Sequence, residues 1–256
     1  MIFLTFLVGL AGIGAGWLAT AVAHRVPLDQ ELGTPWVRCP QCGVPATGLD
    51  RFPLISYLRL GGKCRQCGAA ISPRYPVVEV LTGALFAGAA LLIGFQWILP
   101  AYLWFVAVTM TLVLTDLDHQ RIPNRILYPG TAIAVVLLTA GAAGDGPIEN
   151  IPMALLAGAI YLVVMLLLSL LTRGGFGMGD VKLAFLLGVF LGYPAWHYLV
   201  WGTALGFLVG SVAAIVLLVT RRRGRRDPFP FGPAMVVGAW LALPLTPWLT
   251  TLAVGG

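Results

Sequence analysis

The sequence predicts an all-α polytopic membrane protein with about eight transmembrane helices and one sizeable polar loop. Three observations support this fold class. Of the 256 residues, 59% are hydrophobic and only 10% are charged, whereas a soluble domain carries about 25% charged residues. Uncharged stretches long enough to cross a bilayer recur along the chain. The basic residues collect between these stretches, so we expect the lipid bilayer to surround most of the chain.

Eight uncharged stretches account for the predicted spans, since about 20 apolar residues cross a bilayer. The first stretch lacks the basic start of a cleaved signal, so we interpret it as a retained helix. Gly12 and Gly16 within it have the spacing of closely packed membrane helices. The expected spans are residues 2–23, two within 80–115, 126–144, 150–172, two within 183–220, and 229–254.

The placement of positive charge predicts the orientation of these spans. All 16 Lys and Arg residues fall within residues 25–74, 121–125, 173–182 and 221–226, and basic residues concentrate in cytoplasmic loops. With eight spans, all four clusters lie in the cytoplasm and both termini lie outside. The formal net charge of +6 therefore reflects membrane orientation, and we expect no nucleic-acid partner.

The polar loop at residues 24–79 contains every cysteine of the chain, as two CxxC pairs with 21 residues between them. Two such turns, each followed by a glycine, supply four thiolates for one tetrahedral zinc. Because the loop is expected to face the reducing cytoplasm, zinc is favoured over two disulfides. A site closed by four thiolates is structural, and it would fold a loop too polar to hold a core alone. The predicted zinc ligands are Cys39, Cys42, Cys64 and Cys67.

These features divide the chain into three expected parts. Residues 1–23 form the first transmembrane helix, residues 24–79 form the cytoplasmic zinc-knuckle loop, and residues 80–256 form a membrane core of seven helices. Within that core, acidic residues stand at the cytoplasmic ends of two predicted spans.

Carboxylates at the mouth of a membrane helix are costly and mark function. Asp116 ends the third span and Asp180 begins the sixth, so the topology places both on the same side. On a helix, Asp118 points about 160° away from Asp116, so only one of them faces a given partner. Asp180 lies among glycines at positions 174, 175, 177 and 179, which suit backbone that lines a cavity.

Two carboxylates that meet cannot both ionise, so they hold one proton and can activate one water, as in aspartyl proteases. We therefore interpret Asp116 and Asp180 as a pair that cuts a peptide bond. Lys182, His119 and Asp118 are candidates for tuning this pair. Alternatives are a structural or ion-pathway role for the acids in a transporter, or a membrane assembly scaffold with a structural zinc loop.

Seven short blocks stand in an order and spacing that match one known family. They lie at residues 38–42, 53–58, 64–67, 71–79, 116–124, 177–182 and 229–233. The last two contain Gly177-Met178-Gly179-Asp180 and Phe229-Pro230-Phe231-Gly232-Pro233. With these blocks the chain resembles the bacterial type IV prepilin peptidases, which are GxGD-type intramembrane aspartyl proteases.

The resemblance implies a reaction and a location. It makes Asp116 and Asp180 the catalytic aspartates of an aspartic endopeptidase. Its substrate is the basic leader of a type IV prepilin or pseudopilin precursor, cut after a glycine at the cytoplasmic face. The resemblance places the chain in the bacterial cytoplasmic membrane. It also implies that the new amino terminus is then methylated with S-adenosylmethionine.

Two further expectations follow from this resemblance. Residues 16–22 lack the polar Ser and Asn that the family often shows there, a departure that bears on methylation more than on cleavage. Glu79 matches a family position, and we expect it to pair with Arg74 or with a backbone donor.

Overall fold

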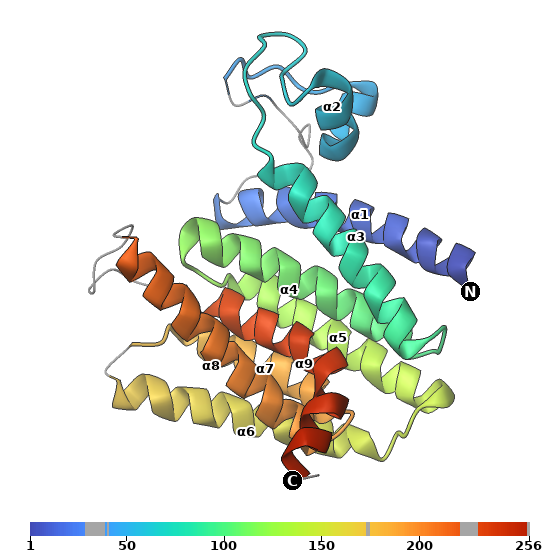
Figure 1. The fold of residues 1–256 in the computed structure, drawn as a ribbon, viewed down its shortest axis with the longest axis vertical. Coiled ribbons are helices and arrows are strands. Elements are labelled where there is room, and N and C mark those ends of the chain that lie inside the picture. The colour runs from blue at the N-terminus through green and yellow to red at the C-terminus, as the bar shows by residue number, and fades with distance from the viewer. Residues whose placement is uncertain (29–38, 40, 173–174, 221–229, 255–256) are drawn as a thin grey trace. The chain divides into compact units, whose positions relative to one another are not determined.

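The computed structural model is helical over most of the residues it describes, which are 1–28, 39, 41–172, 175–220 and 230–254. Within these residues no strand forms, and an isolated bridge joins Lys63 and Ala70. This confirms the predicted all-α class. The helices, most of them labelled in Figure 1, are α1 (Ile2–Arg25), the 3₁₀ turns η1 (Val26–Leu28) and η2 (Gly48–Arg51), α2 (Pro53–Leu60), α3 (Arg74–Ile93), α4 (Leu99–His119), α5 (Asn124–Asp145), α6 (Asn150–Leu171), α7 (Met178–Gly192), α8 (Trp196–Val219) and α9 (Gly232–Val254).

Seven helices of the described residues are long and apolar enough to cross a membrane, namely α1, α3, α4, α5, α6, α8 and α9. The remaining predicted span corresponds to α7, which has 15 residues and is therefore about 22 Å long. The hydrocarbon core of a bilayer is about 30 Å thick, so α7 is shorter than this core. Eleven residues of α7 are buried, which means that protein surrounds most of this helix.

The helix α3 begins at Arg74, six residues before the uncharged stretch that predicted it at residue 80. Arg74 and Glu79 lie in its first two turns. These charges set the start of the uncharged stretch at residue 80, although the helix itself begins at Arg74. As a result, Glu79 belongs to a membrane helix rather than to the polar loop that precedes it.

The chain divides into two compact units, and α4 contributes to both. The first unit comprises residues 1–95 and 103–114, and in it α1 packs along α3 (Figure 1). A Cβ added to Gly12 would lie 2.7 Å from Phe86 Cβ, and one added to Gly16 would lie 2.9 Å from Glu79 Cα. The approach of the two helices therefore depends on these glycines, as their spacing predicted.

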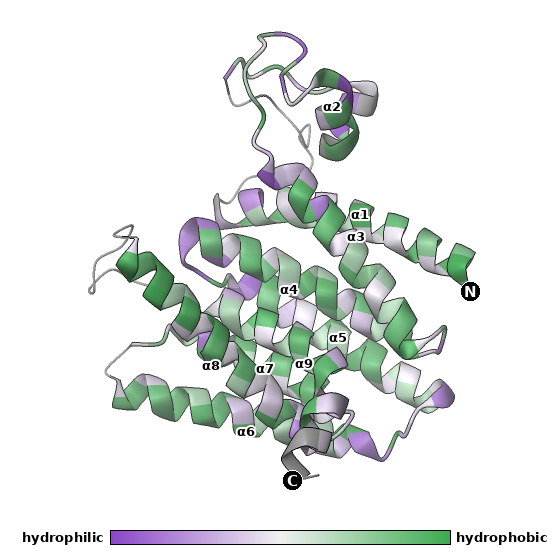
Figure 2. Cartoon of the chain, viewed as in Figure 1, coloured by the Kyte–Doolittle hydropathy of each residue, from purple (hydrophilic) through white to green (hydrophobic). Residues whose placement is uncertain are grey.

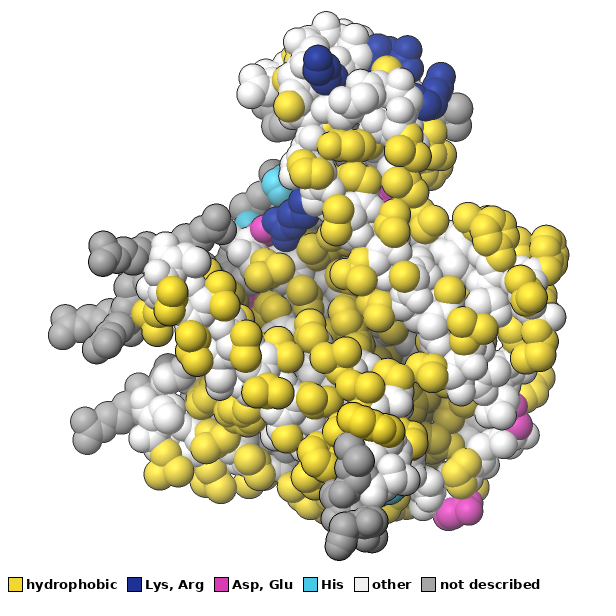
Figure 3. Space-filling view, in the orientation of Figure 1, with side chains coloured by type: hydrophobic (Ala, Val, Ile, Leu, Met, Phe, Trp, Pro, Cys, Tyr) yellow, Lys and Arg dark blue, Asp and Glu magenta, His cyan; other side chains and the backbone are white. Residues whose placement is uncertain are grey.

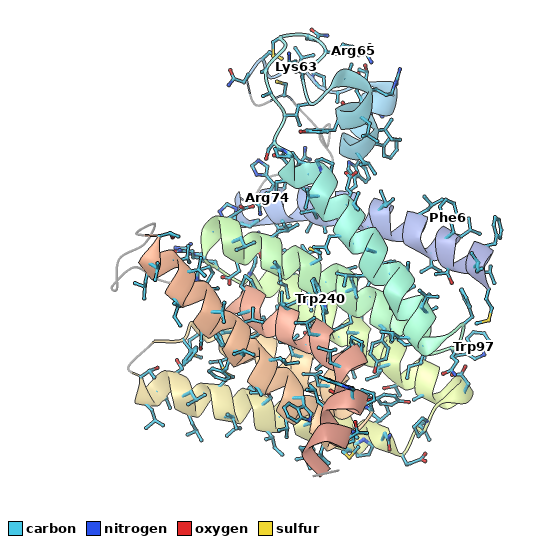
Figure 4. All side chains as sticks on the ribbon, in the orientation of Figure 1. Phe6, Lys63, Arg65, Arg74, Trp97 and Trp240 are labelled. Carbon is cyan, nitrogen blue, oxygen red and sulfur yellow. The ribbon has the colours of Figure 1, made fainter. Side chains whose placement is uncertain are left out.

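The cysteine module, which we define as Cys39 and residues 41–73, belongs to the same unit. It consists of turns around the short helix α2 and is more hydrophilic than α1 and α3 (Figure 2). Lys and Arg side chains gather on its visible face (Figure 3), and Lys63 and Arg65 lie on it in Figure 4. The module is thus a small basic body attached to membrane helices.

The second unit comprises residues 96–102 and 115–256, and α7 lies at its centre. α6 packs along α7 and α8 packs along α9, while α7 also contacts α5, α8 and α9. Gly158 and Gly188 let α6 and α7 meet, because a Cβ on Gly188 would lie 2.7 Å from Gly158 Cα. Apolar side chains are spread over the visible face of these helices (Figure 3), which suits contact with lipid.

Two hydrogen bonds join the ends of different helices in the second unit. The backbone N–H of Trp97, just before α4, donates to Asp145 Oδ2 at the end of α5 over 2.7 Å. Asn150 Nδ2, at the start of α6, donates to the Tyr193 carbonyl after α7 over 3.0 Å. These bonds join helix ends of the second unit that are distant in sequence.

Candidate active site and cysteine cluster

Asp116 lies in the last turn of α4 and is buried, with 5% of its surface exposed. The helix ends at His119 because Gln120 turns into the left-handed conformation, with φ of 52°. The Gln120 N–H donates to the Asp116 carbonyl over 2.9 Å. Asp118, two residues further on, is exposed. The structure therefore separates the two acids of this stretch as helical geometry requires.

Asp180 lies in the first turn of α7 and is also buried, with 6% of its surface exposed. Its Oδ2 accepts a hydrogen bond from the Gly177 N–H over 3.3 Å. A Cβ on Gly179 would lie 2.9 Å from Ile122 Cβ, so glycine at 179 lets the segment after α4 approach the start of α7. Gly174 of the predicted glycine-rich stretch lies outside the described residues.

The two carboxylates converge on one point beside Gly232, the first residue of α9. A Cβ built on Gly232 would lie 2.8 Å from Asp116 Oδ2 and 3.2 Å from Asp180 Oδ1. The two oxygens are therefore at most about 6 Å apart, the sum of these two distances. Both atoms belong to the second unit. The structure thus brings together the two aspartates that the sequence placed on one side of the membrane.

This geometry suits two carboxyl groups that share one proton and one water. Two hydrogen bonds of about 2.8 Å, the usual O–H···O length, reach across a gap of this size. Asp116 Oδ2 accepts no hydrogen bond within the described residues although it is buried. Two buried carboxylates at such a separation disfavour double ionisation, so the arrangement can supply a base and an acid to one reacting group.

Lys182, which the sequence made a candidate for tuning the pair, turns to other partners. Its Nζ donates to Asn124 Oδ1 over 3.1 Å and lies 5.5 Å from the centre of the Tyr128 ring. These contacts connect α7 to the first turns of α5. Lys182 therefore ties together two helices near the acidic pair.

Glu79 occupies a different kind of site, in the first unit. It is buried, with 2% of its surface exposed, and its Oε2 accepts a hydrogen bond from the Leu54 N–H over 2.9 Å. Leu54 is in the first turn of α2, where backbone N–H groups lack partners within the helix. Glu79 thus caps α2 from α3, which agrees with the expected backbone donor.

The four cysteines converge as their spacing predicted, and all four thiols are free of disulfides. Their Sγ atoms lie within 4.8 Å of one another, and Cys39 Sγ lies 3.7 Å from Cys67 Sγ. Four sulfurs around a tetrahedral zinc at about 2.3 Å stand about 3.8 Å apart. The cluster therefore has the composition and the size of a structural zinc site.

Both CxxC pairs build the same turn. The Gly43 N–H donates to the Cys39 carbonyl over 2.9 Å, and the Gly68 N–H donates to the Cys64 carbonyl over 3.0 Å. Both glycines have φ near +70°, at 68° and 69°, which side chains disfavour. Hydrogen bonds from the backbone N–H groups of Cys42 and Gln41 lower the pKa of the Cys39 thiol to about 6, which favours the thiolate that metals bind.

A cavity of about 600 Å³ lies between the cysteine module and the end of α1 in the first unit. Its size is within the range of small-molecule sites, about 300–1,000 Å³. Aromatic and charged side chains mix in its wall, including Trp17, Arg25, Asp50, Arg65 and Tyr75. Such a wall can bind a ligand that carries both a flat ring and charged groups.

Sequence reasoning missed two residues of the acidic site. Gly232 stands within the block at 229–233, to which the sequence assigned no role, and Ile122 lies beside the same point, with Cδ1 3.3 Å from the Cβ position on Gly232. The available signal was the Gly-Pro pair at the start of the last apolar stretch. That signal indicates a helix start and does not reveal which side chains the helix start meets.

Two family models match the chain. The model described as "Bacterial Peptidase A24 N-terminal domain" matches residues 10–93. The model described as "Type IV leader peptidase family" matches residues 103–219, a range that contains both Asp116 and Asp180. No solved structure matches the chain.

Curated relatives carry the name prepilin leader peptidase/N-methyltransferase. The relative from Neisseria gonorrhoeae is 35% identical over 88% of this chain and 79% of its own length. The one from Pseudomonas aeruginosa is 33% identical over 91% of this chain and 88% of its own length. The one from Bacillus subtilis is 31% identical over 94% of this chain and 93% of its own length.

Proposed function

The chain belongs to the type IV leader peptidase family, and on this premise we propose that Asp116 and Asp180 are the dyad with which it cleaves prepilin leaders. The single observation that carries the proposal is the convergence of two buried carboxylates on one point beside Gly232. The transporter and scaffold alternatives are not favoured, because the relatives are named as a peptidase.

Hydrolysis by this pair needs one proton shared between two carboxyl groups. The ionised carboxylate takes a proton from water, and the water oxygen attacks the carbonyl carbon of the scissile peptide bond. The protonated carboxyl gives its proton to the carbonyl oxygen, which forms a tetrahedral diol. When the C–N bond breaks, a proton passes to the leaving nitrogen, so that a carboxylic acid and an amine result.

The substrate we propose is a type IV prepilin or pseudopilin precursor with a short basic leader, cut after a glycine. The basic clusters of the chain support a cytoplasmic location for the acidic pair, since positive charge marks cytoplasmic loops. We propose that the protein lies in the bacterial cytoplasmic membrane with both termini outside. Of the four basic clusters, residues 221–226 lie outside the described residues.

We propose that the cysteine module holds one structural zinc through Cys39, Cys42, Cys64 and Cys67. The support is that the four sulfur donors lie within 4.8 Å of one another. Four thiolates fill the coordination of a tetrahedral zinc, so no position stays open for catalysis. When bound, the metal would cross-link two turns that are otherwise held by a few backbone hydrogen bonds. Metal analysis of the purified protein should find about one zinc per chain, and disulfides across the pairs would contradict this assignment.

We further propose that the cavity beside the cysteine module accepts S-adenosylmethionine, because the relatives are also named as N-methyltransferases. Trp17 or Tyr75 would stack on the adenine, while Arg65 and Asp50 would face the charged amino-acid end. When bound, this compound supplies a methyl group to the new terminal amine. Titration of the purified protein with S-adenosylmethionine should show binding that Tyr75→Ala weakens, whether or not substrate is cleaved.

The dyad is tested with purified protein and a prepilin that carries a basic leader. Asp116→Asn and Asp180→Asn should each lower the rate of leader removal by at least about 100-fold, the usual contribution of an acid–base group. Asp118→Asn is the matched control, since Asp118 is exposed and only two residues from Asp116. Rapid cleavage by either dyad variant would exclude the proposed mechanism.

A further inference from the structure

Gly232 is the first residue of α9, a helix of 23 residues. Backbone N–H groups in the first turn of a helix have no partner within the helix, and this end of the helix dipole favours negative charge. Here the acidic pair lies beside that helix start, because a Cβ built on Gly232 would lie 2.8 Å from Asp116 Oδ2 and 3.2 Å from Asp180 Oδ1. One helix start therefore faces two carboxylates from different helices.

The missing side chain of Gly232 is important at this point. A Cβ at this position would lie 2.8 Å from Asp116 Oδ2, a distance under 3.0 Å that real Cβ atoms essentially never show. The same Cβ would lie 3.2 Å from Asp180 Oδ1 and 3.3 Å from Ile122 Cδ1. Both aspartates are buried, so the added methyl would meet them inside the protein.

The buried Asp116 Oδ2 is the nearest heavy atom to the Cβ position on Gly232. It accepts no hydrogen bond within the described residues, and a buried carboxylate oxygen normally has a partner. That oxygen faces Gly232 at the distance given above, beside Asp180 Oδ1. The open side of Gly232 is thus the side on which both oxygens meet.

We propose that Gly232 is the positioning residue of the dyad. Its lack of a side chain lets the two carboxylates come close enough to share one proton and one water. Any side chain would push Asp116 and Asp180 apart. This inference rests on the proposed dyad, and it assigns a role to a residue outside the acidic stretches.

The first test is Gly232→Ala in full-length purified protein with the prepilin substrate. We expect kcat to fall by about 100-fold, since a displacement of about 1 Å in an active site has this effect, while KM changes by less than about threefold. The pH range of activity should become narrower, because carboxyl groups that are further apart share a proton over a smaller range. Gly88→Ala is the matched control, as a Cβ there meets nothing within 4 Å.

The second test measures thermal stability instead of catalysis, so it also applies if the Gly232→Ala protein folds poorly. If the added methyl meets Asp116 Oδ2, the loss of thermal stability from Gly232→Ala should be smaller in an Asp116→Ala background, by at least about 2 °C. Equal losses of Tm in both backgrounds, or a Gly232→Ala kcat within threefold of the natural protein, would overturn the inference. Those results would leave the dyad standing if Asp116→Asn and Asp180→Asn are inactive.

Discussion

Among the described residues, Glu79 is the buried acid of the first unit, whereas Asp116 and Asp180 are buried together in the second unit. Glu79 accepts a hydrogen bond from the Leu54 N–H over 2.9 Å, so its charge meets the start of a helix. The two aspartates meet beside Gly232, so their charges compete. All three acids are buried, and the presence of a second carboxylate at the same point distinguishes the two regions.

This difference separates a structural acid from a reactive pair. A single carboxylate with its own donor fixes the segment that it touches. Two carboxylates that meet at one point can exchange a proton. Burial alone, which the sequence indicates through the surrounding apolar residues, therefore does not identify the catalytic acids.

The largest expected effect concerns the pair acting as one unit. The double variant Asp116→Asn/Asp180→Asn should cleave prepilin no more slowly than the worse of the two single variants, because either change already removes the shared proton. Leader removal by the three proteins, measured with equal amounts of folded enzyme, checks this. Losses that multiply would show two acids working independently and would undo the contrast with Glu79.

The next prediction tests whether Glu79 has a structural role. Glu79→Ala leaves the Leu54 N–H without its acceptor, which costs about 1–3 kcal/mol for a buried group, while cleavage stays within about threefold. Faster trypsin digestion of the cysteine module is the measurement. Glu79→Gln, which keeps an acceptor oxygen, should be digested more slowly than Glu79→Ala. Loss of cleavage in both variants would make Glu79 part of the reaction.

A smaller effect is expected at Lys182, which joins the helix of Asp180 to α5. Lys182→Met keeps the apolar stem but removes the hydrogen bond to Asn124 and the charge near Tyr128. A hydrogen bond of this kind contributes about 1 kcal/mol, so kcat should fall by up to about tenfold. Asn124→Ala should have a similar effect, and the double variant should add little to it. A loss as large as that of Asp180→Asn would place Lys182 in the dyad itself.

The smallest effect concerns Asp50, an acid in the wall of the cavity beside the cysteine module. Asp50 Oδ2 accepts a hydrogen bond from Arg65 Nε over 2.6 Å, and this partner holds the pKa of Asp50 below its ordinary value of 3.8. The pair therefore stabilises the module above that pH and loses its contribution as the pH falls through the lowered pKa. Salt should weaken it as well. Digestion of Asp50→Asn at pH 7 in low salt should match that of the natural protein in high salt.

Local patterns in the sequence were sufficient for some of these features. The cysteine cluster follows from two short turns with a glycine after each, and both glycines have the positive φ expected of them. The divergence of Asp116 and Asp118 follows from helical geometry. The helix class and the presence of two helices within residues 183–220 follow from the uncharged stretches.

Other features depend on contacts between distant segments, which no local pattern contains. The start of α3 was placed too late because Arg74 and Glu79 are charged. Arg74 is the first residue of the helix, and Glu79 is buried within it. The role of Gly232 was missed because it depends on α4, α7 and α9 meeting at one point. The short length of α7 was missed because its apolar residues run on into the next stretch. The catalytic roles of Asp116 and Asp180 stay a prediction until the variants are measured.

The enclosure of α7 also bears on how the protein responds to its membrane. A change in acyl-chain length acts first on helices that face lipid, which tilt to match the new thickness. α6 and α8 present exposed apolar side chains such as Leu170 and Ile215, whereas most of α7 is covered. The helix that carries Asp180 is therefore insulated from lipid composition, and leader processing should persist when a bacterium remodels its membrane with temperature.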